Sequence, residues 1–255
     1  EILIGLVGSE MCIRDSISPV QTYNPAYRGN NREVFNKSGK FLYKTTTYFF
    51  REDLNWTCLA ELLGEKYKTV QKVNVLNHAC SNGQEPYTLA VKLIQILGKE
   101  AKKFFPIQAK DIDFDNIESA NRGRLGIKLN EMYRINHYTK NQLTSFFTLG
   151  KPANPNNDLV LIPKENIKSK VNFSQADILK DTSEKLPDNT VILCRNFWPY
   201  LAPGEREQLA SNLYQNIGDN SLIITGDFDY RSNTPDLLKS RGFVEIGMNN
   251  VYMKR

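Results

Sequence analysis

The sequence has little from which a metal site or a disulfide framework could be built. It contains only two histidines, His78 and His137, and neither stands beside a second good ligand, so we expect no metal site. The cysteines lie far apart without any paired spacing, which disfavours a disulfide framework and a zinc knuckle alike. We therefore interpret them as reduced thiols and expect a cytoplasmic protein. These cysteines are Cys12, Cys58, Cys80 and Cys194.

The sequence also lacks a long apolar run and a block of charge. No stretch of about eighteen apolar residues occurs, so we expect no membrane insertion. The formal net charge is +5 and the lysines are dispersed, which favours an ordinary solvated surface over a face that binds nucleic acid. An acidic protein substrate is compatible with this surface. The length suits one core domain with at most a small accessory domain, and we expect a monomer.

The first part of the chain shows no periodic pattern. Residues 11–16, Met-Cys-Ile-Arg-Asp-Ser, resemble a translated sequencing adapter, so we exclude residues 1–16 from the fold as an artefact and expect the natural N-terminus to be missing. An export signal does not fit, because no basic region precedes the apolar residues 2–7. Residues 17–50 carry prolines, glycines and asparagines with little periodicity, which indicates a loosely structured lead-in.

From residue 51 onward, helical and strand patterns alternate. Apolar residues at helical spacing predict helices, and short apolar runs predict buried strands. The helices are predicted at about 51–65, 86–97, 115–121 and 203–217, and the strands at 73–77, 105–109, 191–194 and 221–225. This order is typical of a mainly parallel sheet covered on both faces, so the expected fold class is α/β and doubly wound.

Two regions depart from this alternation. The segments 222–225 and 251–253 flank a short predicted helix at 235–240, which favours an antiparallel hairpin at one edge of the sheet. Residues 124–173 are rich in Asn, Pro and Lys and contain strand-like pieces, the last of them at 171–173. We interpret the middle region as a small β-rich insertion at about 144–173.

Polar residues follow three of the predicted strands. Ligands of open α/β sheets bind beyond the carboxyl ends of the strands, so these segments form the candidate site. In residues 79–88, Gly83 lets the backbone approach a ligand closely, and Pro86 starts a helix whose free amide groups face the same space. Glu85, just before that proline, would present a carboxylate to a cationic group.

The other two segments are acidic and aromatic. Asp111 ends the second strand, where nucleotide-binding folds place the carboxylate that accepts ribose hydroxyls, and Asp113 fits better as the cap of the next helix. After the strand at 191–194, the position of Arg195 and Asn196 is hard to explain by packing. The aromatic residues that follow are more often core residues than site residues. They are Phe197, Trp198 and Tyr200.

Five motifs in order along the chain resemble those of the CheR-type chemoreceptor glutamate methyltransferases, which use S-adenosylmethionine. They are Thr-Thr-Thr-Tyr-Phe-Phe-Arg at 45–51, Ser-Asn-Gly-Gln-Glu-Pro-Tyr-Thr at 81–88, Asp-Ile-Asp at 111–113, Val-Asn-Phe with Asp-Ile-Leu at 171–173 and 177–179, and Cys-Arg-Asn at 194–196 followed by Tyr200. The resemblance implies a Rossmann-like class I methyltransferase domain at 51–255, with 17–50 as the remnant of the family's helical domain.

The resemblance also implies roles for single residues. Arg51 and Tyr200 would be the catalytic residues. The implied cofactor is S-adenosylmethionine. Its methionine end would be bordered by Thr47 and Arg51, its amino group by Glu85, its ribose by Asp111, its adenine by Asp177 and Ile178, and its sulfonium by Asn196 and Phe197.

The implied partner is a protein substrate with exposed glutamates, as in a chemoreceptor. A glutamate side chain has a pKa near ~4.3 and is already ionised at about pH 7, so the attacking carboxylate requires no general base. The task left to the enzyme is alignment. Our hypothesis is that Arg51 steers the carboxylate and Tyr200 fixes its orientation.

Several positions depart from the family's pattern. Thr45 stands where the family usually has Asn, Gln84 replaces a common Glu, and residues 150–158 lack the glycine-rich turn associated with docking a receptor tail. Two alternatives therefore stay open. One is a methyltransferase with another protein or a small molecule as acceptor, and the other is a catalytically degenerate relative that acts as a binding module.

Overall fold

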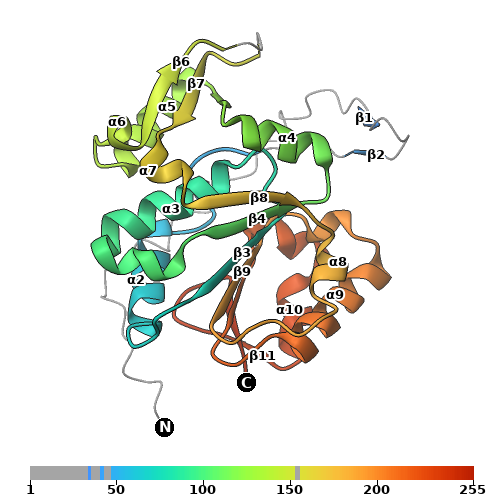
Figure 1. Ribbon diagram of the computed structural model, residues 1–255. Helices are drawn as coiled ribbons and strands as arrows, with labels where there is room; N and C mark the ends of the chain where they lie inside the picture. Colours follow the sequence, from blue (N-terminus) through green and yellow to red (C-terminus); the bar gives the residue numbers. More distant parts are fainter. Residues whose placement is uncertain (1–33, 36–40, 43–46, 153–155) are drawn as a thin grey trace.

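Seven strands form the main sheet of the protein. The computed structural model describes residues 34–35, 41–42, 47–152 and 156–255. The strand order is β11-β12-β10-β9-β3-β4-β8, and β12 runs antiparallel to both of its neighbours. Figure 1 shows β8, β4, β3 and β9 next to one another in this sheet. The predicted doubly wound α/β fold with an antiparallel edge hairpin is therefore confirmed. The strands are β3 (Asn74–His78), β4 (Ile107–Asp111), β8 (Val171–Gln175), β9 (Thr190–Cys194), β10 (Leu222–Ile224), β11 (Phe243–Glu245) and β12 (Val251–Lys254).

Helices cover both faces of this sheet (Figure 1). Helices α2 (Trp56–Lys66) and α3 (Gln84–Leu97) pack on one face, and α9 (Pro203–Asn216) and α10 (Thr234–Ser240) pack on the other. The remaining helices outside the insertion are short. They are η2 (Gly98–Phe104), α4 (Phe114–Arg122), α8 (Ile178–Asp181), η3 (Trp198–Tyr200) and η4 (Asp227–Ser232).

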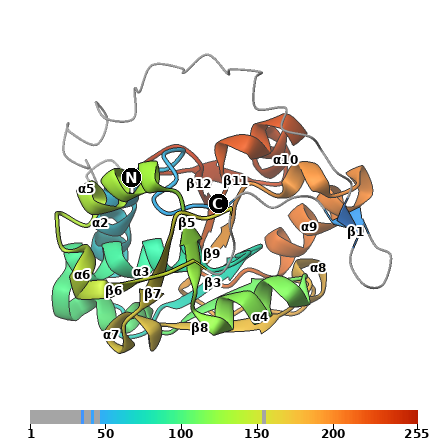
Figure 2. The ribbon, with the colours of Figure 1, turned by 90° about the horizontal axis from the view of Figure 1, so that it is seen from above.

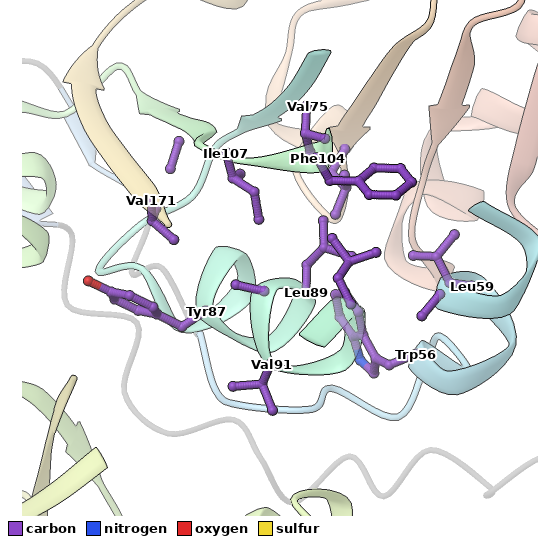
Figure 3. Close-up of a cluster of buried hydrophobic side chains, with 14 of the residues drawn as sticks. Trp56, Leu59, Val75, Tyr87, Leu89, Val91, Phe104, Ile107 and Val171 are labelled. Carbon is purple, nitrogen blue, oxygen red and sulfur yellow. The ribbon is translucent and has the colours of Figure 1, made fainter. Parts of the chain in front are cut away.

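The alternation of side chains along β9 divides the core in two. Val191 and Leu193 belong to the cluster under α2 and α3, whereas Ile192 and Cys194 belong to the cluster under α9 and α10. A strand buried on both faces is typical of the centre of a parallel sheet. Figure 3 shows the first cluster, to which α2, α3, β3, β4 and β8 contribute Trp56, Leu59, Leu89, Val75, Ile107 and Val171.

Helix α2 begins five residues later than its apolar pattern predicts. Asn55 adopts an extended backbone, and its side chain accepts a hydrogen bond of 3.0 Å from the backbone N–H of Cys58, which caps the helix. The indole N–H of Trp56 donates to the backbone oxygen of Arg51 at 2.9 Å. As a result, residues 51–54 form a turn rather than a helix, and this turn carries Arg51 and Asp53.

The middle region folds as a separate three-stranded sheet with short helices. Its strand order is β5-β7-β6, and every pairing is antiparallel. Its elements are β5 (Leu125–Ile127), α5 (Leu129–Tyr138), α6 (Leu143–Phe146), β6 (Phe147–Gly150), β7 (Leu159–Pro163) and α7 (Glu165–Lys168). The last strand-like piece, 171–173, lies instead in β8 of the main sheet, where Val171 pairs with Ile107. We call residues 125–168 the insertion.

Two short strands lie near the start of the described chain, apart from the main sheet and the insertion. Strands β1 (Val34–Phe35) and β2 (Phe41–Leu42) pair antiparallel, and the adapter-like residues lie outside the described part of the chain. Cys80 and Cys194 are free, whereas Cys58 is disulfide-bonded, so the expectation of reduced thiols is wrong for Cys58. Within the described ranges, no helix could cross a membrane. The same ranges hold no group of three or more His, Cys, Asp or Glu side chains placed to bind a metal ion.

Candidate functional site

The candidate residues gather at one rim of the main sheet. Strands β4, β3, β9 and β10 are parallel neighbours, so their carboxyl ends meet at the same edge. The segments that leave these ends carry Ser81, Asp111, Arg195 and Gly226. The turn before α2 joins them, because its Asp53 bonds directly to the segment after β9.

Arg195 is the centre of this rim. Its side chain is fully buried, and its guanidinium donates to Glu85 Oε2 and to Asp53 Oδ1, each at 2.5 Å. The same group lies 4.9 Å from the ring centroid of Trp56, which adds a cation–π contact. Burial opposes the positive charge, but Glu85 and Asp53 outweigh it and raise the pKa of Arg195. Arg195 thus ties the start of α3 to the turn before α2. We call Arg195, Asp53 and Glu85 the arginine cluster.

Asn196 is held in a left-handed backbone conformation beside this cluster. Its φ is 63°, and its side chain donates to Asp53 Oδ2 at 2.9 Å and accepts from the backbone N–H of Phe228 at 3.1 Å. Gly226 packs so closely that a Cβ atom there would lie 2.3 Å from Asn196 Oδ1. Only glycine fits at that position, which lets the loop after β10 touch the loop after β9.

Asp229 fixes the backbone of both loops. Its carboxylate accepts hydrogen bonds from the backbone N–H groups of Asn196 at 2.7 Å, Gly226 at 2.8 Å and Trp198 at 3.1 Å. Burial raises the pKa of Asp229 to about 7, and the three amide donors partly oppose this increase. Asp229 therefore determines where the predicted site residue Asn196 stands.

Glu85 stands beside an acceptor atom that has no partner. Asn77 of β3 donates to Glu85 Oε1 at 2.8 Å. The side-chain oxygen of Asn77 is buried and makes no hydrogen bond within the described chain, and the same holds for Gln84 Oε1 at the start of α3. Buried acceptors without a donor are costly, so a donor-rich cationic group bound next to Glu85 would satisfy an atom that the protein leaves unpaired.

Asp111 joins the loops that follow β3 and β4. Its two carboxylate oxygens accept from the backbone N–H of Ser81 at 2.7 Å and of Asp113 at 2.9 Å. Burial raises the pKa of Asp111, and these bonds partly counter it. Asp113 caps α4 by accepting from Asp115, as predicted. Asp111 is therefore not wholly free for a ligand, although each carboxylate oxygen can accept more than one hydrogen bond.

The outer side of the rim carries part-exposed arginines and tyrosines. Arg51 is 26% exposed at its side chain, pairs with Asp53 at 3.6 Å and lies 5.3 Å from the ring centroid of Tyr48. Tyr200 is 40% exposed and packs against Phe228 with ring centroids 5.4 Å apart. Both predicted catalytic side chains are thus partly exposed at the rim and are not buried in the core.

The other predicted contacts lie farther from the arginine cluster. Asp177 caps α8 by accepting from Leu179 at 3.0 Å, and Ile178 is buried in the core under α9. Thr47 and Phe197 are half-buried. Among the described residues, no hydrogen bond or ion pair connects Thr47, Asp177 or Ile178 with the cluster. The alternative view of the aromatic segment holds for Trp198, which is fully buried and donates its indole N–H to Cys194.

The charge at the rim favours a cationic ligand. Arg51 and Arg195 are surrounded by a larger number of acidic side chains. Burial, followed by repulsion from Asp53, raises the pKa of Asp227, so this carboxylate also lies within the field of the cluster. Excess negative charge fits a ligand that carries an ammonium and a sulfonium, which is the predicted cofactor. The acidic residues are Asp53, Glu85 and Asp227.

A separate cavity lies away from this rim. It has a volume of about 520 Å³ and lies between strands β3 and β4 and the segment at 180–187. Lys72, Gln108 and Lys185 are among its lining residues, and none of the predicted site residues lines it.

Motif-based reasoning missed several residues of the rim. Asp53, Asp229 and Asn77 were not among the predicted site residues, although all three bond to residues that were. Asp53 follows Arg51 by two positions, which is the only local signal for it. The sequence did point to Arg195, because packing does not explain a charged residue at the end of a buried strand.

Comparisons with known proteins agree with the predicted family. A family model described as "CheR methyltransferase, SAM binding domain" matches residues 45–243. "Chemotaxis protein methyltransferase 2" of Vibrio cholerae serotype O1 is 22% identical over 201 residues, which cover 77% of this chain and 66% of that protein. "Chemotaxis protein methyltransferase" of Salmonella typhimurium is 26% identical over 196 residues, which cover 77% of this chain and 64% of that protein. The chain thus spans about two thirds of the length of these relatives.

Among solved structures, the chain is similar to a TehB-like SAM-dependent methyltransferase from Corynebacterium glutamicum. The TM-score is 0.41 at 12% sequence identity, and the match covers 79% of this chain and 89% of that one.

Proposed function

Because the chain belongs to the family described as "CheR methyltransferase, SAM binding domain", we propose that it transfers the methyl group of S-adenosylmethionine to glutamate carboxylates of a chemoreceptor or a similar protein. The observation that carries this proposal is the hydrogen-bonded arginine cluster. It draws three segments far apart in sequence to one sheet rim and leaves Arg51 and Tyr200 part-exposed beside it. A cytoplasmic location and a monomeric state remain predictions.

The residues at the rim fit the cofactor in charge and in hydrogen-bonding capacity. Glu85, with the unpaired oxygen of Asn77 next to it, would take the ammonium group. Asp111 would accept from the ribose, and Asn196 would lie beside the sulfonium together with Phe197. In this proposal Thr47 and Arg51 border the methionine end, and Asp177 and Ile178 border the adenine.

The acceptor side requires orientation rather than proton transfer. When bound, S-adenosylmethionine supplies a methyl carbon made electrophilic by a positively charged sulfur. A glutamate carboxylate is ionised at about neutral pH, so no side chain of this protein must remove a proton from it. Arg51, whose guanidinium has donors to spare, would steer the carboxylate, and Tyr200 would fix its angle of approach.

Burial of the cofactor side should also favour the reaction. An anion that attacks a sulfonium loses its charge together with that of the sulfonium, so a site that excludes water favours the step. The inner wall meets this condition, because Arg195, Asp229 and Trp198 are almost completely buried. The outer wall, where Arg51 and Tyr200 lie, opens to solvent.

Radiolabelled methyl transfer tests this proposal directly. The protein is incubated with methyl-labelled S-adenosylmethionine and a glutamate-rich acceptor protein, and the product is then treated with alkali. A methyl ester releases volatile methanol in base, whereas methylated nitrogen or sulfur does not. Base-labile label on the acceptor is the expected result. Label that resists base would point to a different acceptor, and no transfer to any acceptor would leave only a binding module.

A further inference from the structure

Two arginines from distant parts of the chain lie against one tyrosine at the rim. The guanidinium carbon of Arg51 is 5.3 Å from the ring centroid of Tyr48, and that of Arg134 is 5.0 Å from the same centroid. Arg134 belongs to α5 of the insertion, and no motif pointed to it. The outer wall of the rim therefore holds two positive charges instead of one.

The insertion is packed so that α5 brings Arg134 to this place. The rings of Phe50 and Tyr138 stack with centroids 5.2 Å apart and an angle of 13°. Lys92 of α3 donates to the backbone oxygen of Tyr138 at 2.8 Å, which ties the end of α5 to the main domain. Figure 2 shows α5 lying over the segment that precedes α2. Two contacts at Tyr138, one helical turn after Arg134, thus hold α5 against the main domain.

Within the described part of the chain, neither guanidinium makes an ion pair shorter than 3.6 Å. Arg134 pairs with Glu131 only at 3.7 Å, and its Nε is buried with no hydrogen-bond partner among the described residues. Arg51 pairs with Asp53 at 3.6 Å, while Asp53 already accepts shorter bonds from Arg195 and Asn196. A guanidinium offers five donors, so both head groups retain donors for an anion.

A purely structural role explains Arg134 less well. A side chain that only stabilised α5 would be expected to make close bonds with Glu131, which lies three positions earlier on the same helix. Two like charges against one ring also repel each other unless an anion lies between or beside them. Both side chains are about one quarter exposed, at 26% and 25% of their area, so a ligand can reach them.

We propose that Arg134 forms a second anion subsite of the acceptor site, which binds a carboxylate next to the glutamate that Arg51 receives. The ligand class is an acidic peptide segment with at least two carboxylates close together. This inference rests on the proposed function for the identity of the first glutamate. It goes further in assigning acceptor selection to a side chain of the insertion.

Peptide binding to the protein saturated with S-adenosylhomocysteine tests the subsite without any turnover. One peptide carries two glutamates, either adjacent or one helical turn apart, and its partner carries glutamine in place of one of them. Calorimetry on the wild-type chain should give tighter binding of the peptide with two carboxylates. In Arg134→Gln this preference should disappear, because the dissociation constant of that peptide rises by about tenfold or more. Affinity for S-adenosylhomocysteine should stay unchanged.

Two further variants separate the subsite from a general effect of charge. Arg134→Lys should keep part of the preference, because a lysine supplies the charge without the planar fork. Arg122→Gln removes the same charge from an exposed residue of α4 that pairs with Glu118, and it should leave the preference intact. The inference is overturned if the wild-type chain shows no preference, if Arg134→Gln retains it, or if Arg122→Gln loses it equally.

The proposed function is tested separately, by measuring base-labile methyl transfer by the wild-type chain. If no methyl ester forms although the peptide preference depends on Arg134, the proposed function is wrong and the anion subsite stands. If methyl ester forms at the same rate and with the same peptide preference in Arg134→Gln, the subsite is wrong and the proposed function stands.

Discussion

The arginine on the inner wall of the rim differs from the two on the outer wall in its burial and in its ion pairs. Arg195 on the inner wall is fully buried and bonded at 2.5 Å to each of two carboxylates. Arg51 and Arg134 on the outer wall are part-exposed, and their ion pairs are 3.6 and 3.7 Å long. The charge of Arg195 is therefore balanced by two close carboxylates, whereas Arg51 and Arg134 each have one more distant carboxylate partner.

This difference separates positioning from recognition. A buried arginine with both partners in place holds loops together, and removing it would take the shared cation away from two carboxylates. An exposed arginine with spare donors adds little to stability but is ready to bind an anion. We therefore expect variants of the inner wall to lower stability and variants of the outer wall to lower methyl transfer.

The largest effect is expected at the inner wall. Arg195→Gln should lower the free energy of unfolding by about 3–5 kcal/mol, because the half-buried carboxylates of Glu85 and Asp53 would lose the cation that pairs with both of them. Urea denaturation measures this change. Arg241→Gln is the matched control, since it breaks an exposed pair with Glu207 and should cost less than about 1 kcal/mol. An equal decrease in the free energy of unfolding for both variants would contradict the structural role given to the inner wall.

At the outer wall, we expect a substitution to lower methyl transfer and to leave stability almost unchanged. Arg51→Ala should lower methyl transfer by at least about a hundredfold, because the acceptor carboxylate loses its steering cation. The melting temperature should stay close to that of the wild-type chain, since Arg51 is part-exposed and makes only a loose ion pair. Radiolabelled transfer and thermal denaturation give the two values. An active Arg51→Ala variant would refute the catalytic assignment.

The smallest effect concerns the support of the inner wall and depends on pH. Burial raises the pKa of Asp229 to about 7, so the folded protein holds this proton more tightly than the unfolded chain does. The contribution of Asp229 to stability is therefore fully present below about pH 4 and is lost as the pH rises through about 7.

Asp229→Asn removes this titration and places an amide against backbone N–H groups. We expect it to lower the free energy of unfolding by about 1–3 kcal/mol near pH 5 and by less near pH 8. Urea denaturation at both pH values measures the difference. Asp219→Asn, at an exposed position, is the surface control. A larger loss at the higher pH would contradict the role given to Asp229.

The fold and the gathering of the candidate residues at one rim could be predicted because they depend on local patterns. Apolar runs identified β3, β4 and β9, and polar residues directly after them had to lie at one rim of a parallel sheet. The family and the α/β fold are confirmed. The start of α2 was predicted too early, because the pattern of apolar residues does not register the cap that Asn55 provides.

Contacts between distant segments could not be predicted. Asp53 and Arg195 are 142 positions apart, and Asp229 meets Asn196 from the loop after β10. No spacing rule connects such pairs, since they are set by how the strands are ordered in the sheet. Residues 171–173 were assigned to the insertion because they end a region rich in Asn, Pro and Lys. The polar Asn172 also makes this main-sheet strand resemble a surface hairpin. Arg134 had no signal at all.

The most direct test of the account is calorimetry of the wild-type chain with two ligands. S-adenosylhomocysteine carries the ammonium group that Glu85 and Asn77 are proposed to hold, and 5′-methylthioadenosine lacks it. We predict one binding site for S-adenosylhomocysteine and at least about tenfold weaker binding of 5′-methylthioadenosine. Equal affinity for the two ligands, or no heat with S-adenosylhomocysteine, would contradict the claim that this rim holds the cofactor.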